Sequence, residues 1–416
     1  MTTSDKIEKF FKNFGLFAFT TCLLLVVLET VSTLALYYYN INPKKYEYNQ
    51  ILSGYHVFKN TPGAPLWNEV KKNPNDPPSI VDGNGFISDN PIYVKKPDDV
   101  IRIFVMGGSA VFGVGQFPPF AVVHPYHLGN LSYSLGLAGQ LESYLSSQRP
   151  GLKFEVINAA ATDRMLHQSM IYYQETISRF SPDIIINLDG YNDLHYGIMS
   201  GRPYSEMESR IPSYLNLLDN SRLYQPNFMT FLNMGYYKFF RDMVGEQLKQ
   251  QFFLQDDMDQ EKYSFNQYKK FENSFIATSQ RFLQILDHYT AVLNADKVDF
   301  IFAIQPMLYR QINKEWSKIE NQMRREVFGV GPNLPKEVVD RFILMSKYFF
   351  DEYLAKASQE RVEKSGYRFL DLNQEIRHLK SDFELYVDYC HFTIGGSRIL
   401  AEILGKEVLK RFPVGS

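Results

Sequence analysis

The feature that most constrains this chain is an alternation, from about residue 100 onward, of short apolar runs with longer helical stretches. The apolar runs are rich in Ile, Val and Phe and nearly continuous, which is typical of parallel strands buried on both faces. Expected strands cover 101–106, 154–158, 183–188, 300–304 and 367–370, and expected helices cover roughly 134–148, 165–180, 267–294, 336–364 and 394–411. This order predicts an α/β domain with a central five-stranded parallel sheet. Helices would cover both of its faces, and sites would form at the carboxyl ends of the strands.

An apolar run before this domain, residues 15–39, is interrupted by a single charge, Glu29. It is longer than the ~20 apolar residues that a helix needs to cross ~30 Å of hydrocarbon. The apolar core of a secretory signal is shorter, about 7–15 residues, and a small-residue cleavage site follows it. This run ends instead in three tyrosines, which suit the aromatic belt of a membrane interface. We therefore expect an uncleaved transmembrane helix over residues 15–39, after a short tail of residues 1–14.

The charges that flank this run predict its orientation. Three lysines precede it and two follow it, namely Lys6, Lys9, Lys12, Lys44 and Lys45. This small positive-inside bias favours a cytoplasmic N-terminus in a single-pass protein, with the rest of the chain outside the cytoplasm in a periplasm, lumen or extracellular space. An ionisable group at membrane depth is costly, so Glu29 is either a contact for a membrane-protein partner or a protonated or snorkelling side chain in a lone span.

Two further regions complete the organisation of the chain. Residues 40–98 contain eight prolines and recurrent aromatic residues, which predicts an extended arm that packs along the following domain. The domain itself covers residues 99–416. A largely helical insertion is expected between its third and fourth strands, at about 195–265, and a lid, a partner surface and a membrane-apposed surface all remain open for it.

Charge and composition exclude several kinds of partner. The formal net charge of −2 gives no general attraction to nucleic acid, so we expect no nucleic-acid partner. The two cysteines, Cys22 and Cys390, do not form a pattern with zinc-ligand spacing, and no carboxylate cluster accompanies His124 and His127. Phosphate-binding glycine loops of the P-loop type are absent from the sequence. We therefore expect neither a metal nor a cofactor.

The first candidate for chemistry is Ser109, which follows the first expected strand directly in the order Met106-Gly107-Gly108-Ser109. Two glycines let the backbone turn sharply and bring a nucleophile to the rim of the sheet. A Gly-Gly-Ser segment on its own is more often an ordinary turn. It is not the GxSxG elbow of an α/β-hydrolase.

Two other strand ends carry polar side chains that a serine nucleophile needs. The third expected strand is followed by Gly190-Tyr191-Asn192-Asp193, where Asn192 is either an amide donor for a developing oxyanion or part of an Asx turn. After the fifth strand, Asp388 and His391 are three residues apart, so one turn lets the carboxylate reach the imidazole. Such a carboxylate fixes the tautomer of a histidine that takes the proton of a serine.

This set of motifs, in this order, resembles the SGNH hydrolase family, also called GDSL-like esterases. The resemblance covers about residues 100–411 and rests on short blocks, of which Gly107-Gly108-Ser109, Gly190-Tyr191-Asn192-Asp193 and Asp388-Tyr389-Cys390-His391 match the family's nucleophile, GxND and DxxH blocks. It implies a three-layer α/β/α flavodoxin-like sandwich. It also implies Ser109 as nucleophile, His391 as general base, Asp388 as its orienting acid, and an oxyanion hole that includes Ser109 and Asn192.

The remaining block departs from the family pattern. After the second strand the family has an Asn followed by a Gly whose backbone N–H binds the oxyanion, whereas Asp163 stands at the expected glycine in Asn158-Ala159-Ala160-Ala161-Thr162-Asp163. A backbone N–H survives this change, and Asp tolerates positive φ better than most residues. A carboxylate beside an oxyanion hole is unfavourable unless it turns away or pairs, for example with Arg164. The expected oxyanion hole therefore consists of Ser109, Asp163 and Asn192.

Three functions follow as hypotheses. The first is a membrane-anchored serine esterase that removes O-acyl groups, most simply acetyl, from an extracytoplasmic glycan or lipid through an acyl-serine intermediate. The second is an O-acyltransferase that works with a membrane partner docked through Glu29. The third is a catalytically weak binding or scaffold protein on the same fold, which the departure at Asp163 permits.

Overall fold

The computed structural model describes residues 3–38, 50–53, 57–60, 66, 79, 81–115, 129–194, 269–308, 349–376, 384–388 and 390–413. The chain divides into two compact units, and each is described by itself. Helix α1 (Thr3–Tyr38) belongs to the first unit. The sheet and its covering helices belong to the second. The expected insertion at about 195–265 lies outside the described residues, and so do His124, His127 and much of the expected arm.

Helix α1 is long and apolar enough to cross a membrane. Its segment Asn13–Leu34 has a mean hydropathy of 2.1, and none of the most apolar window is buried against the rest of the chain. Four of its threonines, Thr20, Thr21, Thr30 and Thr33, donate their hydroxyl protons to the backbone carbonyl four residues earlier, which satisfies these donors within the helix. Length and composition make this helix a candidate membrane span, in the region where the sequence predicts one.

The second unit contains a five-stranded parallel sheet, which confirms the predicted fold. Its strands are β3 (Val100–Gly107), β6 (Lys153–Asn158), β7 (Ile184–Asp189), β8 (Asp299–Ile304) and β9 (Arg368–Asp371). They lie in the order β6-β3-β7-β8-β9, so the second strand along the chain lies outside the first. This is the flavodoxin-like order, whose reversal between β3 and β7 opens a crevice at the carboxyl ends of the strands.

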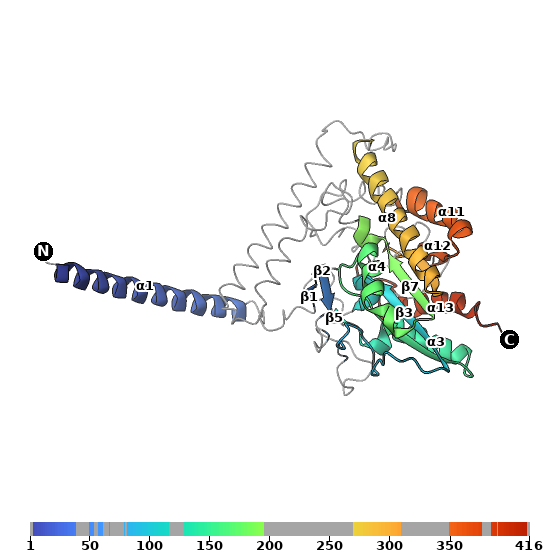
Figure 1. Cartoon of the computed structure of the whole chain (residues 1–416), viewed down its shortest axis with the longest axis horizontal. Coiled ribbons are helices and arrows are strands. Elements are labelled where there is room, and N and C mark those ends of the chain that lie inside the picture. Colours follow the sequence, from blue (N-terminus) through green and yellow to red (C-terminus); the bar gives the residue numbers. More distant parts are fainter. Residues whose placement is uncertain are drawn as a thin grey trace. The chain divides into compact units, whose positions relative to one another are not determined.

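Helices cover both faces of the sheet (Figure 1). One face carries α3 (Leu137–Gln148) and α13 (Ile394–Leu409), which pack on each other. The other carries α4 (Leu166–Glu175), α8 (Lys269–Ala295) and α11 (Lys356–Ser365), the last preceded by a π-helical stretch, Phe349–Ala355. Successive residues of β3 alternate between the two cores, with Val105 in one and Phe104 in the other.

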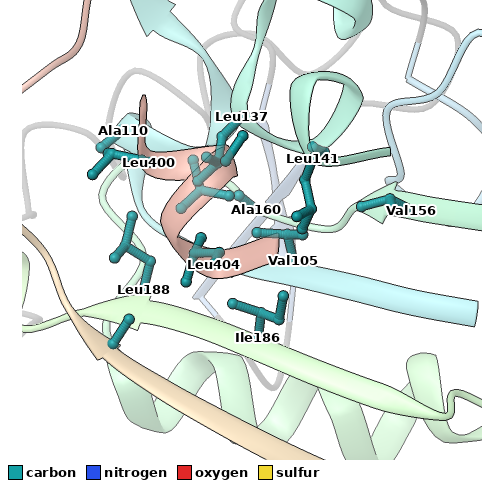
Figure 2. Packing of buried hydrophobic residues seen from close by; sticks show 14 of the residues in the cluster. Val105, Ala110, Leu137, Leu141, Val156, Ala160, Ile186, Leu188, Leu400 and Leu404 are labelled. Atoms are coloured by element: carbon teal, nitrogen blue, oxygen red, sulfur yellow. The ribbon is translucent and has the colours of Figure 1, made fainter. Parts of the chain in front are cut away.

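The core beneath α13 explains why this helix is held firmly near the carboxyl ends of the strands. Figure 2 shows Leu404 of α13 near Val105, Ile186 and Leu188 of the sheet, and Leu400 of the same core on the neighbouring turn of the helix. All five side chains are at most 2% exposed. Burial of a leucine side chain stabilises by roughly 1.5–3 kcal/mol, so these contacts fix α13 and the loop that precedes it.

The expected elements differ from the observed ones mainly at helix ends. The single helix expected at 165–180 is wrong in its second part, because α4 ends at Glu175 and Ile177–Phe180 is a 3-10 turn. Ser181, which ends this turn, takes a left-handed conformation, and its N–H donates to the carbonyl of Ser178 at 3.3 Å. The helix expected at 134–148 begins at Leu137, after a 3-10 turn at Tyr133–Leu135.

Part of the segment before the sheet belongs to the second unit and packs within it. The strands β1 (Gln50–Ser53) and β2 (Val57–Asn60) form a hairpin-like antiparallel pair. Asn60, which is 1% exposed, donates through Nδ2 to the carbonyls of Gly85 and Ala160, both at 2.8 Å. Ile87 forms a β-bridge with Asn158 at the end of β6. This segment therefore contacts the loop that follows β6, beside the expected site.

Candidate functional site

Ser109 lies where β3 ends, as the first residue of the short helix α2 (Ser109–Phe112). The two preceding glycines allow the backbone to approach its neighbours closely. At Gly107, φ is +148°, and an added Cβ would lie under 3.0 Å from the backbone oxygen of Leu188 on β7. At Gly108 an added Cβ would come equally close to Nδ2 of Asn192. Backbone therefore requires glycine at Gly107, whereas at Gly108 the small residue leaves room for the Asn192 amide.

Asn158, the last residue of β6, holds α2 in place. Its side-chain amide donates to the carbonyl oxygens of Val111 at 3.0 Å and Phe112 at 3.3 Å. Its Oδ1 accepts the backbone N–H of Ala160 at 3.1 Å. One buried side chain thus connects the helix that begins with Ser109 to the loop that leads to Asp163.

A continuous chain of hydrogen bonds connects Ser109 with the loop before α13. Nε2 of His391 is 2.7 Å from Oγ of Ser109, and Nδ1 of His391 is 2.6 Å from Oδ2 of Asp388. Ser109 and His391 are 282 positions apart in the sequence, so the fold itself brings them together. With the proton of the imidazole on Nδ1, facing the carboxylate, Nε2 is free to accept the proton of the serine hydroxyl.

Asp388 is held as a carboxylate. Its Oδ1 accepts the backbone N–H groups of Cys390 at 2.8 Å and His391 at 2.7 Å, while Oδ2 faces the imidazole. Burial alone would raise the pKa of Asp388, but the charge of His391 and these hydrogen bonds outweigh it and hold the pKa below its ordinary value. An ionised Asp388 can orient His391 and stabilise the imidazolium that proton transfer produces.

Cys390 lies against the same histidine without the properties of a nucleophile. Its Sγ is 3.7 Å from Nδ1 of His391, and burial, with the neighbouring Asp388 second, raises the pKa of the thiol well above its ordinary value. Ligand atoms of Asp388, Cys390 and His391 lie within 4.8 Å of one another, close enough for one metal ion. A thiol that stays protonated and an imidazole with both nitrogens in hydrogen bonds make poor ligands, so this set fits proton transfer better than metal binding.

Asp163 and Asn192 lie near Ser109, the first on the loop after β6 and the second in a short helical turn after β7. Asp163 has φ of +60°, and its side chain is exposed. The loop carrying it is tied to the turn after β3, because the N–H of Ala161 donates to the carbonyl of Gly107 at 3.2 Å. Nδ2 of Asn192 donates to the carbonyl of Arg164 at 2.9 Å and lies against Gly108. Asn192 therefore lies between the residue after Asp163 and the residue before Ser109.

Arg164 points away from the site. Its guanidinium group donates to the carbonyl of Ala159 and lies over the ring of Tyr172, 4.3 Å from the ring centroid. The residue is 3% exposed, and burial lowers the pKa of its guanidinium. The side chain of Arg164 thus anchors the loop in the core, in contacts that do not include the carboxylate of Asp163.

The structure brings every sequence-predicted site residue to the carboxyl edge of the sheet: Ser109, Asp163, Asn192, Asp388 and His391. Sequence reasoning missed three supporting groups, Asn60, Asp189 and Asp193. Asp189 and Asp193 are 2% and 1% exposed, and they form a buried acidic pair. The acidic residues around the Gly-Tyr-Asn segment were a visible signal for the pair, whereas nothing in the local sequence marks Asn60.

Comparisons with known proteins found similar structures but no similar sequence. No family model matches the chain, and no curated protein matches it. A lipase/acylhydrolase from Enterococcus faecalis is 13% identical, with a TM-score of 0.38, over 76% of this chain and 98% of that one. The acetyl xylan esterase AlAXEase is 9% identical, with a TM-score of 0.37, over 74% of this chain and 100% of that one.

A variant of the acetylxylan esterase Axe2 from Geobacillus stearothermophilus gives similar values. It is 12% identical, with a TM-score of 0.35, over 74% of this chain and 93% of that one. Likenesses this low say nothing of the activity, which has to be inferred from the side chains of the site.

Proposed function

We propose that this chain is a serine ester hydrolase. The observation that carries the proposal is the hydrogen-bonded series Ser109 Oγ, His391 Nε2, His391 Nδ1 and Asp388 Oδ2, with separations of 2.7 and 2.6 Å. In a serine hydrolase such a series removes the hydroxyl proton as the oxygen attacks, which makes an otherwise weak nucleophile reactive. No other arrangement among the described residues combines a nucleophile, a base and an orienting carboxylate in this way.

The proposed reaction proceeds through an acyl-enzyme. Oγ of Ser109 attacks the ester carbonyl carbon while Nε2 of His391 takes the hydroxyl proton, and Asp388 stabilises the resulting imidazolium. The C–O bond to the leaving group then breaks, and His391 returns the proton to the departing alcohol. Water, deprotonated by His391, next attacks the acyl-serine, and the carboxylic acid leaves as Ser109 regains its proton.

The oxyanion of each tetrahedral intermediate would be bound by the N–H groups of Ser109 and Asp163 and by the side-chain amide of Asn192. The support for this assignment is the contact of Asn192 with both neighbouring backbones, at Gly108 and Arg164. The positive φ of Asp163 also supports it, because this is the conformation expected of the glycine that the family has here. One donor of this kind contributes about 2.7–4 kcal/mol to the stabilisation of an acyl-transfer transition state.

We propose, as substrate, an O-acyl group on a glycan or lipid outside the cytoplasm, most simply an acetyl ester. This choice of substrate rests on the resemblance of the motifs to those of the SGNH hydrolase family and on the candidate membrane span Asn13–Leu34 in α1. With the N-terminal lysines in the cytoplasm, the sheet would lie outside it and the membrane would keep the enzyme near surface polymers. An acceptor hydroxyl in place of water gives the transferase alternative, with Glu29 as the contact for a membrane partner.

The proposal is tested with full-length protein in detergent. Wild type is expected to hydrolyse p-nitrophenyl acetate and Ser109→Ala to lack this activity, with the two proteins unfolding at similar temperatures. If a folded wild type has no more activity than Ser109→Ala, the hydrolase proposal is wrong and the binding-protein alternative takes its place. If an acceptor sugar accelerates release of p-nitrophenol and becomes acetylated, transfer rather than hydrolysis is the reaction.

A further inference from the structure

Two consecutive side chains, Asn192 and Asp193, bind the segment that follows Asp163. Nδ2 of Asn192 donates to the carbonyl of Arg164 at 2.9 Å. Oδ1 of Asp193 accepts the backbone N–H of Leu166 at 3.2 Å. Both side chains are buried, with exposures of 6% and 1%. They therefore fix the first and third residues after Asp163 from the same helical turn, residues 191–194.

The segment needs such support because its conformation is unfavourable in isolation. Asp163 has φ of +60°, which costs a residue with a Cβ roughly 1–2 kcal/mol, and its side chain is exposed. Met165 is still extended, and helix α4 begins only at Leu166. A strained residue persists only where its surroundings hold its conformation. The first turn of α4 follows Asp163 directly, so a fixed position of this turn helps to hold Asp163.

Asp193 is suited to hold this turn in place. The first N–H groups of a helix have no partner within the helix, and a carboxylate at this end also interacts favourably with the helix dipole. The N–H of Met165 is bound by Oε1 of Gln168 at 2.9 Å, and that of Leu166 by Asp193. Asp193 lies in the helical turn that follows β7, so its bond connects α4 to the carboxyl end of that strand, which a contact within α4 cannot do.

The neighbouring Asp189 is buried in the core beside Asp193. Oδ2 of Asp189 accepts hydrogen bonds from Ser169 and Asn187, inside the core. Burial, and after it the negative charge of Asp193, raises the pKa of Asp189 well above its ordinary value. Other charged or titratable groups that act on Asp189 and its surroundings are Arg164 from the loop, Tyr172 from α4 and Tyr289 from α8.

We propose that Asp193 is a positioning residue for the oxyanion hole: by binding the Leu166 N–H it holds α4 and, through it, the Asp163 N–H in line with Ser109. The inference rests on the proposed function, because it assigns Asp163 to the oxyanion hole. Asp193 itself does not touch the substrate. Its loss shifts the donor, and a displacement of about 1 Å near a reacting group can cost about 10²-fold in rate.

The test compares full-length Asp193→Ala and Asp193→Asn with Tyr173→Phe as a matched control. Tyr173→Phe removes a different hydrogen bond of α4, the one from its hydroxyl to Asp296 at 2.7 Å, far from the turn that Asp193 binds. Active sites are counted by the end point of labelling with a fluorophosphonate, and kcat for p-nitrophenyl acetate is expressed per labelled site. A purely structural defect lowers the number of sites or the unfolding temperature, but not kcat per site.

We expect Asp193→Ala to lower kcat per labelled site about 10–100-fold with KM nearly unchanged, because oxyanion binding acts in the transition state. Asp193→Asn should recover most of kcat, since its amide oxygen still accepts the Leu166 N–H. Tyr173→Phe should unfold more easily with unchanged kcat per site. Unchanged kcat per site in Asp193→Ala, or a loss of labelled sites alone, would overturn the proposal.

A second pair of variants decides the matter if Asp193→Ala does not fold. Leu166→Pro removes the N–H itself, and proline suits the first helical position after the extended Met165 (φ −105°, ψ 164°). Leu166→Val keeps the N–H and shortens the side chain similarly. A lower kcat per site in the proline variant alone supports the inference, and equal values for the pair refute it. A wild type that neither labels nor hydrolyses ester refutes the proposed function instead.

Discussion

Substitution of Gly107 by alanine should mainly lower stability, whereas the same substitution at Gly108 should mainly lower activity. A Cβ on Gly107 would meet the backbone oxygen of Leu188, and φ there is +148°. A Cβ on Gly108 would meet only the end of the Asn192 side chain, and φ of −83° with ψ of −158° is open to any residue. The first contact cannot relax without moving β7, whereas the second relaxes when the amide of Asn192 moves.

Magnitudes follow from these contacts. Gly107→Ala is expected to destabilise the protein by about 2–5 kcal/mol, from the positive φ and from overpacking against backbone. Gly108→Ala should change the free energy of unfolding far less, but it displaces one oxyanion donor and so should lower kcat about 10²–10³-fold, equivalent to about 2.7–4 kcal/mol. Urea unfolding and the kinetics of p-nitrophenyl acetate hydrolysis separate the two effects.

A double-mutant cycle tests the physical cause. In the Asn192→Ala background the amide is already gone and the space beside Gly108 is open, so Gly108→Ala should lower kcat little further. If Gly108→Ala keeps wild-type kcat, or if its effect simply adds to that of Asn192→Ala, Asn192 does not act as the donor that its contacts suggest.

Three further predictions concern the groups that support the site. Asp388→Asn should lower kcat about 10⁴-fold, because the amide favours the wrong imidazole tautomer. The pKa of Asp388 is lowered in the folded state, so its carboxylate stabilises the fold fully above the unfolded pKa of about 3.9. In pH-dependent unfolding, the difference in stability between wild type and the variant should therefore shrink as the pH falls through the folded pKa. Asp189→Asn should stabilise the protein at neutral pH, because the raised pKa of Asp189 makes ionisation of this carboxyl unfavourable in the folded state. Thermal unfolding should show that this gain in stability vanishes below about pH 4, where the carboxyl is protonated in the unfolded state as well. A gain that persists at lower pH would refute this cause. Asn60→Ala should destabilise by about 1–3 kcal/mol in urea unfolding, because the buried carbonyls of Gly85 and Ala160 lose their donor, and an unchanged midpoint would contradict the structure.

The sequence was sufficient for the sheet and for the residues at its edge, for a physical reason. Strands such as 300–304 are buried on both faces, so their apolar composition identifies them, and polar residues that follow them must meet at one edge. Helix ends were less predictable. Helix α4 ends at Glu175 and a 3-10 turn follows at Ile177–Phe180, although the apolar pattern continues through both.

Contacts between distant segments could not be predicted from the local sequence. Asn60 has no motif around it, and its role arises only because β2 lies where its amide meets Gly85 and Ala160. Asp193 was visible as part of the Gly-Tyr-Asn-Asp segment, yet its bond to Leu166 depends on how α4 packs beside β7. Burial of Asp189 is likewise a property of the assembled core, and with it the change in its pKa.

The central claim is that Ser109 is the nucleophile of an esterase, and covalent labelling tests it most directly. Full-length protein is reacted with a fluorophosphonate, digested, and the modified peptide identified by mass spectrometry. The account predicts a single adduct on Ser109, absent from Ser109→Ala and formed much more slowly in His391→Ala. A folded wild type that stays unmodified, or an adduct that persists in Ser109→Ala, would contradict it.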